Sequence, residues 1–307
     1  MPPLVSVVIP AHNAEAFLAE AIASVLDQTY PCVEALVVDD GSTDGTGAIA
    51  RGFGASVRCL RQENAGPGAA RNTGLAHARG EYVAFLDADD AFRPERVAVM
   101  VAALRHASPD AAFVTTDAAI WDGRQCRRVF RISRPSPGER GLTAFLDETW
   151  CYIGILARRE SLLRVGGFRR DLWRCEDYDL WLRLLSGGHT YAYVPEPLYL
   201  YRVQEHSLSN DRHRQMLAAH QVDRDALRTL PLTLSQRRRL LHLLWEDRAS
   251  LFGAAAAARR ARGSWAGWAG QRSAWACCQA ARVLLRPQWT LARAWGRHQR
   301  TGQRGGA

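Results

Sequence analysis

The chain has 307 residues, of which 47% are hydrophobic and 23% are charged. These proportions suit a globular protein with a sizeable core and exclude a wholly disordered chain. No run of about 18 apolar residues is free of charge, which argues against a membrane-spanning helix. The first residues, MPPLVSVVIP, lack the basic start and the small-residue cleavage site of a signal peptide. We therefore expect them to form a strand, and we expect a cytoplasmic protein.

The basic residues have an unusual identity and an uneven distribution. All 40 are Arg, which excludes Schiff-base chemistry and a Walker-A phosphate loop, because both need a lysine amine. Residues 1–210 hold 22 Arg and 26 acidic residues, a net charge of −4, whereas residues 211–307 hold 18 Arg and 5 acidic residues, a net charge of +13. The seven cysteines include no CxxC pair, which disfavours a zinc site and a disulfide framework and fits a reducing compartment.

Short apolar runs alternate with helical spacing through the first 117 residues. The runs predict strands at 4–10, 33–39, 57–60, 81–87 and 111–116. The helical spacing predicts helices at 17–26, 45–53, 69–78 and 94–105. This alternation predicts an α/β protein whose mostly parallel, Rossmann-like sheet carries helices on both faces.

The rest of the chain is less regular. Residues 118–140 are polar and predict a connection without clear secondary structure. Beyond it, the pattern predicts helices at 142–147, 159–165 and 176–185 and strands at 152–157, 191–194 and 198–202. From residue 211 onward the pattern is helical, with breaks at Pro231, 263–270 and Pro287. We expect an α/β domain at 1–210, with halves at 1–117 and 118–210, and a basic helical extension at 211–307.

Polar clusters follow three of the predicted strands. They are His12-Asn13, Asp39-Asp40 and Asp87-Ala88-Asp89-Asp90. Ligands of open α/β sheets bind beyond the carboxyl ends of the strands, so these clusters predict one binding edge. Two neighbouring carboxylates at the end of an apolar strand are costly to bury unless a cation offsets them. Their oxygen atoms suit Mg²⁺ or Mn²⁺, although a polar turn that caps the helix after Pro94 is an equal alternative.

Two glycine-containing segments lie between these clusters. In 39–46, Gly41 permits a sharp turn; Asp39 either belongs to that turn or accepts a hydrogen bond from a nucleobase N–H, since a carboxylate is an acceptor only. In 63–72, the glycines allow a close approach to a ligand, and Arg71 can stack on a base or pair with a phosphate. The latter segment does not follow GxGxxG, so a dinucleotide-binding fold is not supported.

Five motifs together resemble a known family. They are SVVIPAHN at 6–13, VVDDGSTDGT at 37–46, NAGPGAARNTGL at 64–75, EYVAFLDADD at 81–90 and CEDYDLWLRL at 175–184. In this order and spacing they resemble the inverting family 2 glycosyltransferases of the GT-A fold. The resemblance covers about 1–205 and leaves 211–307 unexplained. It implies a catalytic domain at 1–210, with the nucleotide-binding half at 1–117 and the acceptor-binding half at 118–210.

The resemblance also implies roles for individual residues. It assigns Asp177 as the catalytic base, Glu176 and Trp181 to the acceptor side, and Asp87 and Asp89 to the metal- and ribose-binding DxD motif, with Asp89 the more direct ligand of Mg²⁺ or Mn²⁺. The residues implied in binding the nucleotide sugar are Pro10, Ala11, Asn13, Asp39, Arg71, Asp87 and Asp89. Without the other motifs, Glu176-Asp177 would be read as an acid pair that the helix N-terminus favours.

The family's chemistry accounts for these residue types. A cation stabilises the charge that gathers on the leaving diphosphate, and one carboxylate takes the proton of the acceptor hydroxyl. One base and no protein nucleophile give a single displacement with inversion. The resemblance therefore implies transfer from a nucleotide-diphosphate sugar, typically a UDP-sugar, to a glycan or lipid-linked acceptor. A catalytically silent nucleotide-sugar-binding or scaffold protein is the alternative, and a retaining transferase is a third.

One position departs from the family pattern. The family often shows Tyr-Arg-x-His after the last strand, where the histidine completes the metal shell. Here Gln204 stands at the histidine position, and His206 follows two residues later. Either a shifted loop brings His206 to the metal or the histidine role is lost.

The tail carries information of its own. Residues 248–307 hold 11 Arg, five Trp and no acidic residue. Arg and Trp on amphipathic helices are typical of proteins that lie on an anionic membrane surface. This composition predicts peripheral contact with the inner face of the plasma membrane, or else Trp side chains that pack on the catalytic domain. No recognition motif supports nucleic-acid binding, so none is expected.

Overall fold

The computed structural model describes residues 1–245 apart from 124, 131–140, 149–152 and 205–210. The chain divides into two compact units, Met1–Ala218 and Ala219–Ala307. The Arg- and Trp-rich segment 248–307 and His206 both lie outside the described residues.

The first part of the sheet is parallel, as the alternating pattern predicts. Its strands are β1 (Val5–Ala11), β2 (Val33–Asp40), β3 (Val57–Gln62) and β4 (Tyr82–Phe85), in the spatial order β3-β2-β1-β4. The register pairs Ala11 of β1 with Asp39 of β2, so the carboxyl ends of these two strands lie side by side. The chain reverses direction after each of these ends, which places the polar clusters at one edge of the sheet.

The second part of the sheet is mixed. Strand β8 (Ile155–Arg158) is antiparallel to both β4 and β6 (Ala111–Trp121), and β9 (Thr190–Arg202) runs parallel to β6. Two short strands, β5 (Ala91–Phe92) and β7 (Cys126–Phe130), pair antiparallel with β9 and β6. The described sheet is therefore parallel through β1–β4 and mixed beyond them, where the sequence suggested a mostly parallel arrangement.

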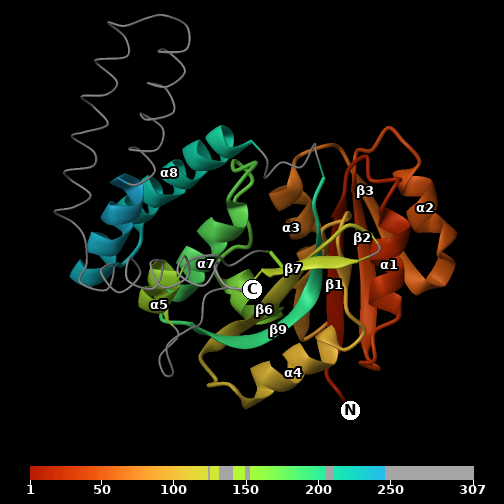
Figure 1. Cartoon of the computed structure of the whole chain (residues 1–307), viewed down its shortest axis with the longest axis horizontal. Helices are drawn as coiled ribbons and strands as arrows, with labels where there is room; N and C mark the ends of the chain where they lie inside the picture. Colours follow the sequence, from red (N-terminus) through yellow and green to blue (C-terminus); the bar gives the residue numbers. More distant parts are fainter. Residues whose placement is uncertain (124, 131–140, 149–152, 205–210, 246–307) are drawn as a thin grey trace, which may run out of the picture. The chain divides into compact units, whose positions relative to one another are not determined.

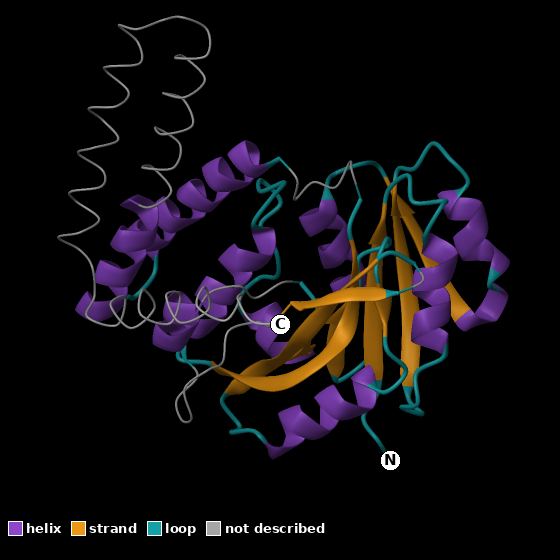
Figure 2. Ribbon diagram, in the orientation of Figure 1, coloured by secondary structure: helices purple, strands orange, loops and turns teal. Residues whose placement is uncertain are grey.

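Helices cover both faces of the parallel strands (Figures 1 and 2). Side chains of Val5, Val7 and Ile9 belong to one core cluster with the buried side of α1 (Leu18–Leu26) and with α4 (Arg96–His106). On the opposite face, α3 (Pro67–His77) approaches β1 so closely that a Cβ on Gly74 would overlap the side chain of Val8. Successive side chains of β1 point to opposite faces of the sheet and therefore pack against two different layers of helices.

The remaining described helices follow β2, β3 and the later strands along the chain. They are α2 (Thr46–Gly52), the 3₁₀ turn Gly54–Ser56, α5 (Leu142–Glu148), α6 (Arg159–Arg164), α7 (Glu176–Ser186), α8 (Arg212–Thr229) and a helical segment at 234–245. Pro231 lies between the last two, at a predicted break. Among the described helices, none is both long enough and apolar enough to cross a membrane.

Two predictions about the second half were wrong in detail. The strands expected at 191–194 and 198–202 form the single strand β9. Pro197 pairs with Asp117 of β6 where the register shifts, and an irregular ladder of this kind can include a residue without a backbone N–H. The connection expected at 118–140 begins as strand, since β6 continues to Trp121 and returns as β7. Residues 131–140 of that connection lie outside the described residues.

Candidate active site

The ends of β1 and β2 are locked together by Asn13. Its backbone N–H donates to the Ser42 hydroxyl (3.0 Å), and its side-chain oxygen accepts from the N–H of Thr43 (2.9 Å). These bonds hold Asn13 in a left-handed conformation with φ of 48°. Pro10 and Ala11, the last residues of β1, lie directly before this turn, Pro10 half-buried and Ala11 buried. The predicted nucleotide-binding residues of β1 therefore border the turn that follows β2.

Asp39 is completely buried and already has two partners. Its carboxylate accepts from the N–H of Ser42 (2.9 Å) and forms an ion pair with Arg61 (2.5 Å). A Cβ on Gly47 would stand 2.7 Å from this carboxylate, so the absence of a side chain there makes room for it. A nucleobase would meet Asp39 together with Arg61, rather than a free carboxylate.

Asp40, which the sequence placed in a polar cluster without a role of its own, holds the glycine-rich loop. Its carboxylate accepts from the N–H groups of Ala65 (3.0 Å) and Gly66 (2.9 Å) at the start of α3. Its carbonyl lies 2.8 Å from Nδ1 of His12. Backbone donors at a helix start are common anion sites, and here a protein carboxylate occupies two of them.

Arg71 is the centre of a buried charge cluster. Its guanidinium forms ion pairs with Asp87 (2.7 Å) and with Glu176, and it lies over the ring of Phe168. Burial alone would lower the pKa of the guanidinium, but the charges of Asp87 and Glu176 outweigh burial and raise it. Arg71 therefore joins the DxD segment after β4 to the acid pair that begins α7, and both of its terminal nitrogens are engaged by protein carboxylates.

Asp177 stands beside this cluster. Burial, followed by the charge of Glu176, raises the pKa of Asp177 to about 7, against the opposing effect of Arg71. One of its carboxylate oxygens accepts from the N–H of Tyr178 (2.8 Å) at the start of α7. The residue as a whole is half-buried. A carboxylate with a pKa near the working pH suits general-base chemistry.

Asp89 is the second carboxylate of the DxD segment. Burial and the charge of Asp87 raise its pKa to about 6. Its side chain accepts a hydrogen bond from Nε2 of Gln204 (2.9 Å), and its carbonyl accepts from Nε of Arg202 (2.8 Å). Gln204, the residue at the family's histidine position, thus contacts Asp89 directly through a neutral amide.

The end of β9 clamps the DxD segment, a role that sequence reasoning missed. The N–H of Arg202 (2.7 Å) and the hydroxyl of Tyr199 (2.7 Å) both donate to the buried carboxylate of Asp90. The Cζ atom of Arg202 lies over the ring of Trp121, 4.3 Å from its centroid, and over the ring of Phe17, 5.0 Å from its centroid. The signal in the sequence is Arg202 of the Tyr-Arg pair; Tyr199, two residues before that pair's tyrosine, belongs to no motif.

The carboxylates present fit a divalent cation. Asp87 pairs with Arg71, and the charge of Arg202 acts on Asp89 without offsetting burial and the charge of Asp87, so the pKa of Asp89 stays raised. No group of three His, Cys, Asp or Glu side chains with metal-ligand geometry occurs among the described residues. Two carboxylates that leave the other positions to phosphate oxygens and water are a familiar arrangement for Mg²⁺.

Trp181, which was expected on the acceptor side, lies in the core. Its side chain is completely buried in α7, and its ring centroid is 5.0 Å from that of Phe113 in β6. Trp181 lies four residues, about one turn, beyond Asp177, and it is one of the buried residues of α7. Trp181 can therefore support the base only through the packing of α7. Glu176, the other residue assigned to the acceptor side, is buried against Arg71.

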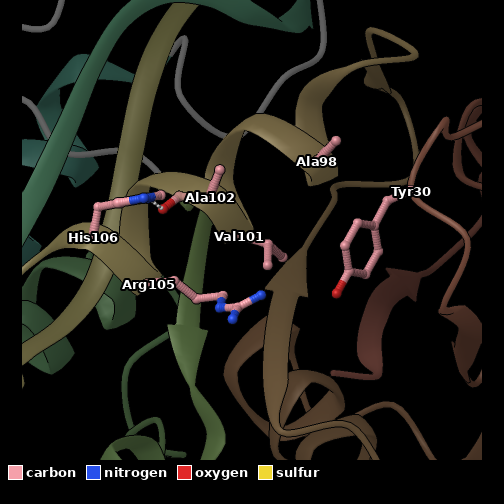
Figure 3. A pocket seen from close by; sticks show the side chains of 6 residues that line it. All are labelled: Tyr30, Ala98, Val101, Ala102, Arg105 and His106. Carbon is pink, nitrogen blue, oxygen red and sulfur yellow. Dashed lines mark hydrogen bonds between the residues drawn. The ribbon is translucent and has the colours of Figure 1, made fainter. Parts of the chain in front are cut away.

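A surface hollow occurs far from the carboxyl ends of the strands. Its lining residues are Tyr30, Ala98, Val101, Ala102, Arg105 and His106 (Figure 3). They come from the outer side of α4 and from the connection before β2, at the end of the sheet where β2 and β6 begin. The hollow therefore lies outside the cluster around Arg71.

The sequence model of the family described as "Glycosyl transferase family 2" matches residues 6–165, more than half of the chain. The chain belongs to glycosyl transferase family 2. It is therefore a glycosyltransferase. The acid pair Glu176-Asp177 follows the matched region, so its assignment depends on the geometry described above.

Curated relatives of this glycosyltransferase include two proteins named for polysaccharide biosynthesis. The succinoglycan biosynthesis protein ExoO of Rhizobium meliloti is 32% identical over 253 residues, which cover 77% of this chain and 73% of ExoO. The O-antigen biosynthesis protein RfbC of Myxococcus xanthus is 36% identical over 205 residues, which cover 64% of this chain and 16% of RfbC.

Two solved structures have a similar fold. S. aureus TarS 1–349 in complex with UDP has a TM-score of 0.63 and 20% identity, covering 81% of this chain and 72% of TarS. The mannosyltransferase PcManGT from Pyrobaculum calidifontis, in complex with GDP-Man and Mn²⁺, has a TM-score of 0.64 and 23% identity, covering 93% and 86%. These likenesses establish the GT-A fold of the enzyme.

Proposed function

We propose that the enzyme transfers a sugar from a nucleotide-diphosphate sugar to a hydroxyl of a glycan or lipid-linked acceptor, with inversion at the anomeric carbon. One observation carries this proposal. Arg71 brings Asp87 of the DxD segment and Glu176 of the acid pair into one buried cluster, and Asp177 stands beside it with its pKa raised to about 7. A donor-side carboxylate and a candidate base therefore lie within one network.

In the proposed reaction, Asp177 accepts the proton of the acceptor hydroxyl. The acceptor oxygen then forms its bond to the anomeric carbon while the bond from that carbon to the diphosphate oxygen breaks. Glu176 pairs with Arg71, which leaves Asp177 as the member of the acid pair without an ion pair among the described residues; this supports a single displacement rather than a glycosyl-enzyme intermediate. A retaining outcome through such an intermediate would need a protein nucleophile in addition to Asp177.

Asp87 and Asp89 are the residues that would hold Mg²⁺ or Mn²⁺ with the diphosphate. When bound, the ion supplies electrostatic stabilisation of the leaving diphosphate. Asn13 and the turns after β1 and β2 form the expected nucleotide side. A UDP-sugar is our first choice of donor, since the resemblance favours uracil and since TarS, a protein of this fold, is complexed with UDP.

The proposed biological setting is the synthesis of a cell-envelope polysaccharide. Support comes from the names of ExoO and RfbC, whose relatedness covers most of this chain. The net charge of +13 in 211–307 supports an enzyme that works at the inner membrane surface on a lipid-linked acceptor. Cytoplasmic nucleotide sugars would then meet the acceptor at that surface.

Donor hydrolysis tests the proposal against the silent alternative. Purified full-length chain is first screened for thermal stabilisation by UDP- and GDP-sugars with Mn²⁺, since ligands that bind the native state raise its melting temperature. Stabilising donors are then followed for release of the nucleotide diphosphate. Binding without release would favour the silent nucleotide-sugar-binding protein, and the anomeric configuration of any product tests inversion.

A further inference from the structure

Trp173 stands out among the described aromatic residues by its exposure. Its side chain is 57% exposed, whereas every other described Trp, Tyr and Phe whose burial is defined is buried or partly buried. It lies in the loop that leads into α7, four residues before Asp177. A solvent-exposed indole presents apolar surface that folding normally buries. Exposed apolar surface at a fixed position often marks a binding site.

The indole ring lies flat on the glycine-rich turn at the start of α3. A Cβ on Gly66 would stand 3.3–3.4 Å from Cδ2, Cε2 and Cε3 of Trp173. A point nearly equidistant from three neighbouring atoms of the six-membered ring lies above the face of that ring. One face of the ring therefore rests on Gly66, where a side chain would displace it.

The turn beneath the ring is held by its backbone conformation and by a hydrogen bond. Gly66 has a φ of +86°, which favours glycine, and its N–H is held by the carboxylate of Asp40 (2.9 Å). Two residues further on, a Cβ on Gly68 would stand 3.5 Å from Cγ of Glu176. The loop that carries Trp173 and the acid pair therefore packs along a single turn, from Gly66 to Gly68.

This arrangement sets the ring close to the candidate base. Gly66 and Gly68 are at most about 7 Å apart along the chain, so Trp173 and Glu176 lie over neighbouring positions of the same turn. Asp177 follows Glu176 directly.

From this geometry we infer that Trp173 is the platform on which the acceptor pyranose stacks. The C–H groups on one face of a pyranose carry partial positive charge and pack on the negative face of an aromatic ring. The inference rests on the proposed transferase function and names the acceptor's contact on the same site. A nucleobase could also stack on an indole, but the ring belongs to the loop of the acid pair, so we assign it to the acceptor.

The test separates acceptor binding from donor binding. Methyl β-glucopyranoside, methyl β-galactopyranoside and methyl N-acetyl-β-glucosaminide are examined by saturation-transfer NMR with the full chain, UDP and Mg²⁺. UDP affinity is measured by calorimetry and donor hydrolysis by nucleotide release. The variants are Trp173→Ala, Trp173→Phe and, as a control, Leu163→Ala, which removes an exposed apolar side chain from α6.

We expect Trp173→Ala to weaken pyranoside binding about tenfold, and with it to raise the acceptor KM at nearly unchanged kcat. UDP affinity and donor hydrolysis should stay within about twofold, Trp173→Phe should recover most of the loss, and Leu163→Ala should match the wild type. A loss of UDP affinity in Trp173→Ala would place a nucleobase on the ring and overturn the inference. So would wild-type chain that binds none of the pyranosides, or pyranoside binding that survives the substitution. A wild-type chain without donor hydrolysis would instead refute the proposed function.

Discussion

The raised pKa of Asp177 predicts that kcat/KM depends on pH between 6 and 8, which a carboxylate with an ordinary pKa would not cause. With a pKa of about 7, about a tenth of the enzyme carries an ionised Asp177 at pH 6 and about nine tenths at pH 8. A general base must be ionised to accept a proton, so kcat/KM should fall about tenfold between pH 8 and pH 6. A carboxylate at the ordinary pKa of 3.8 would be ionised throughout this range, and the profile would be flat.

Two variants isolate this group. Asp177→Asn should reduce kcat on the order of 10²-fold or more and leave UDP affinity nearly unchanged, because the base meets the acceptor hydroxyl and not the nucleotide. Asp171→Asn is the matched control, since Asp171 lies in the preceding loop and pairs with Arg169 (2.6 Å), which holds the pKa of this carboxyl below its ordinary value. The control should keep both the turnover and the pH profile of the wild type.

The same raised pKa has a consequence for stability, with a definite sign. Native protein binds more protons at Asp177 than unfolded protein does between the ordinary carboxyl range and about pH 7, so this group's contribution to stability falls as pH rises through that window. Asp177→Asn should therefore melt above the wild type at pH 8, with the gap narrowing toward pH 5. Near-normal turnover of Asp177→Asn with an acceptor, or a melting gap that is equal at both pH values, would refute the assignment.

Three further predictions concern the metal, the core and the tail. Asp89→Ala should abolish the Mn²⁺-dependent part of UDP binding in calorimetry, and equal affinity of variant and wild type would contradict the metal role. Gly74→Ala should destabilise the fold by about 1–3 kcal/mol, because its methyl group overlaps Val8, whereas Gly52→Ala, which meets no atom within 4 Å, should not lower the melting temperature. The full chain should sediment with phosphatidylglycerol vesicles, less so in high salt, and not with phosphatidylcholine; equal sedimentation with both lipids would show that the charge of 211–307 does not direct binding.

The sequence was most informative where one physical signal dominated. Continuous apolar runs marked β1 and β2 to within about one residue, because strands covered on both faces carry no competing polar pattern. The single strand β9 was missed since Pro195 and Pro197 interrupt the apolar pattern, and only the pairing of β9 with β6 shows that the ladder continues past them through a register shift.

The candidate site was predictable in its residue types but not in its contacts. Motif order brought Arg71, Asp87 and Asp177 into one set, yet residue type alone suggested that Arg71 would meet a base or a phosphate. Its engagement by two protein carboxylates depends on how α3 and α7 pack, which is a long-range property. The contact between Trp173 and Gly66 could not be predicted for the same reason, because Gly66 lies more than a hundred residues earlier in the chain.

The raised pKa of Asp177 follows first from burial and then from the negative charge of Glu176 beside it. Asp87 and Glu176 each pair with one terminal nitrogen of Arg71, so this guanidinium is already shared between two carboxylates. The positive charge of Arg71 lowers the pKa of Asp177 but does not offset burial and Glu176, so Asp177 holds its proton until the pH approaches 7. The cluster that joins the donor side to the acceptor side therefore contains a base that exchanges its proton near neutral pH. Burying the charged form of this base lowers the free energy of unfolding, and Asp177→Asn should recover that loss.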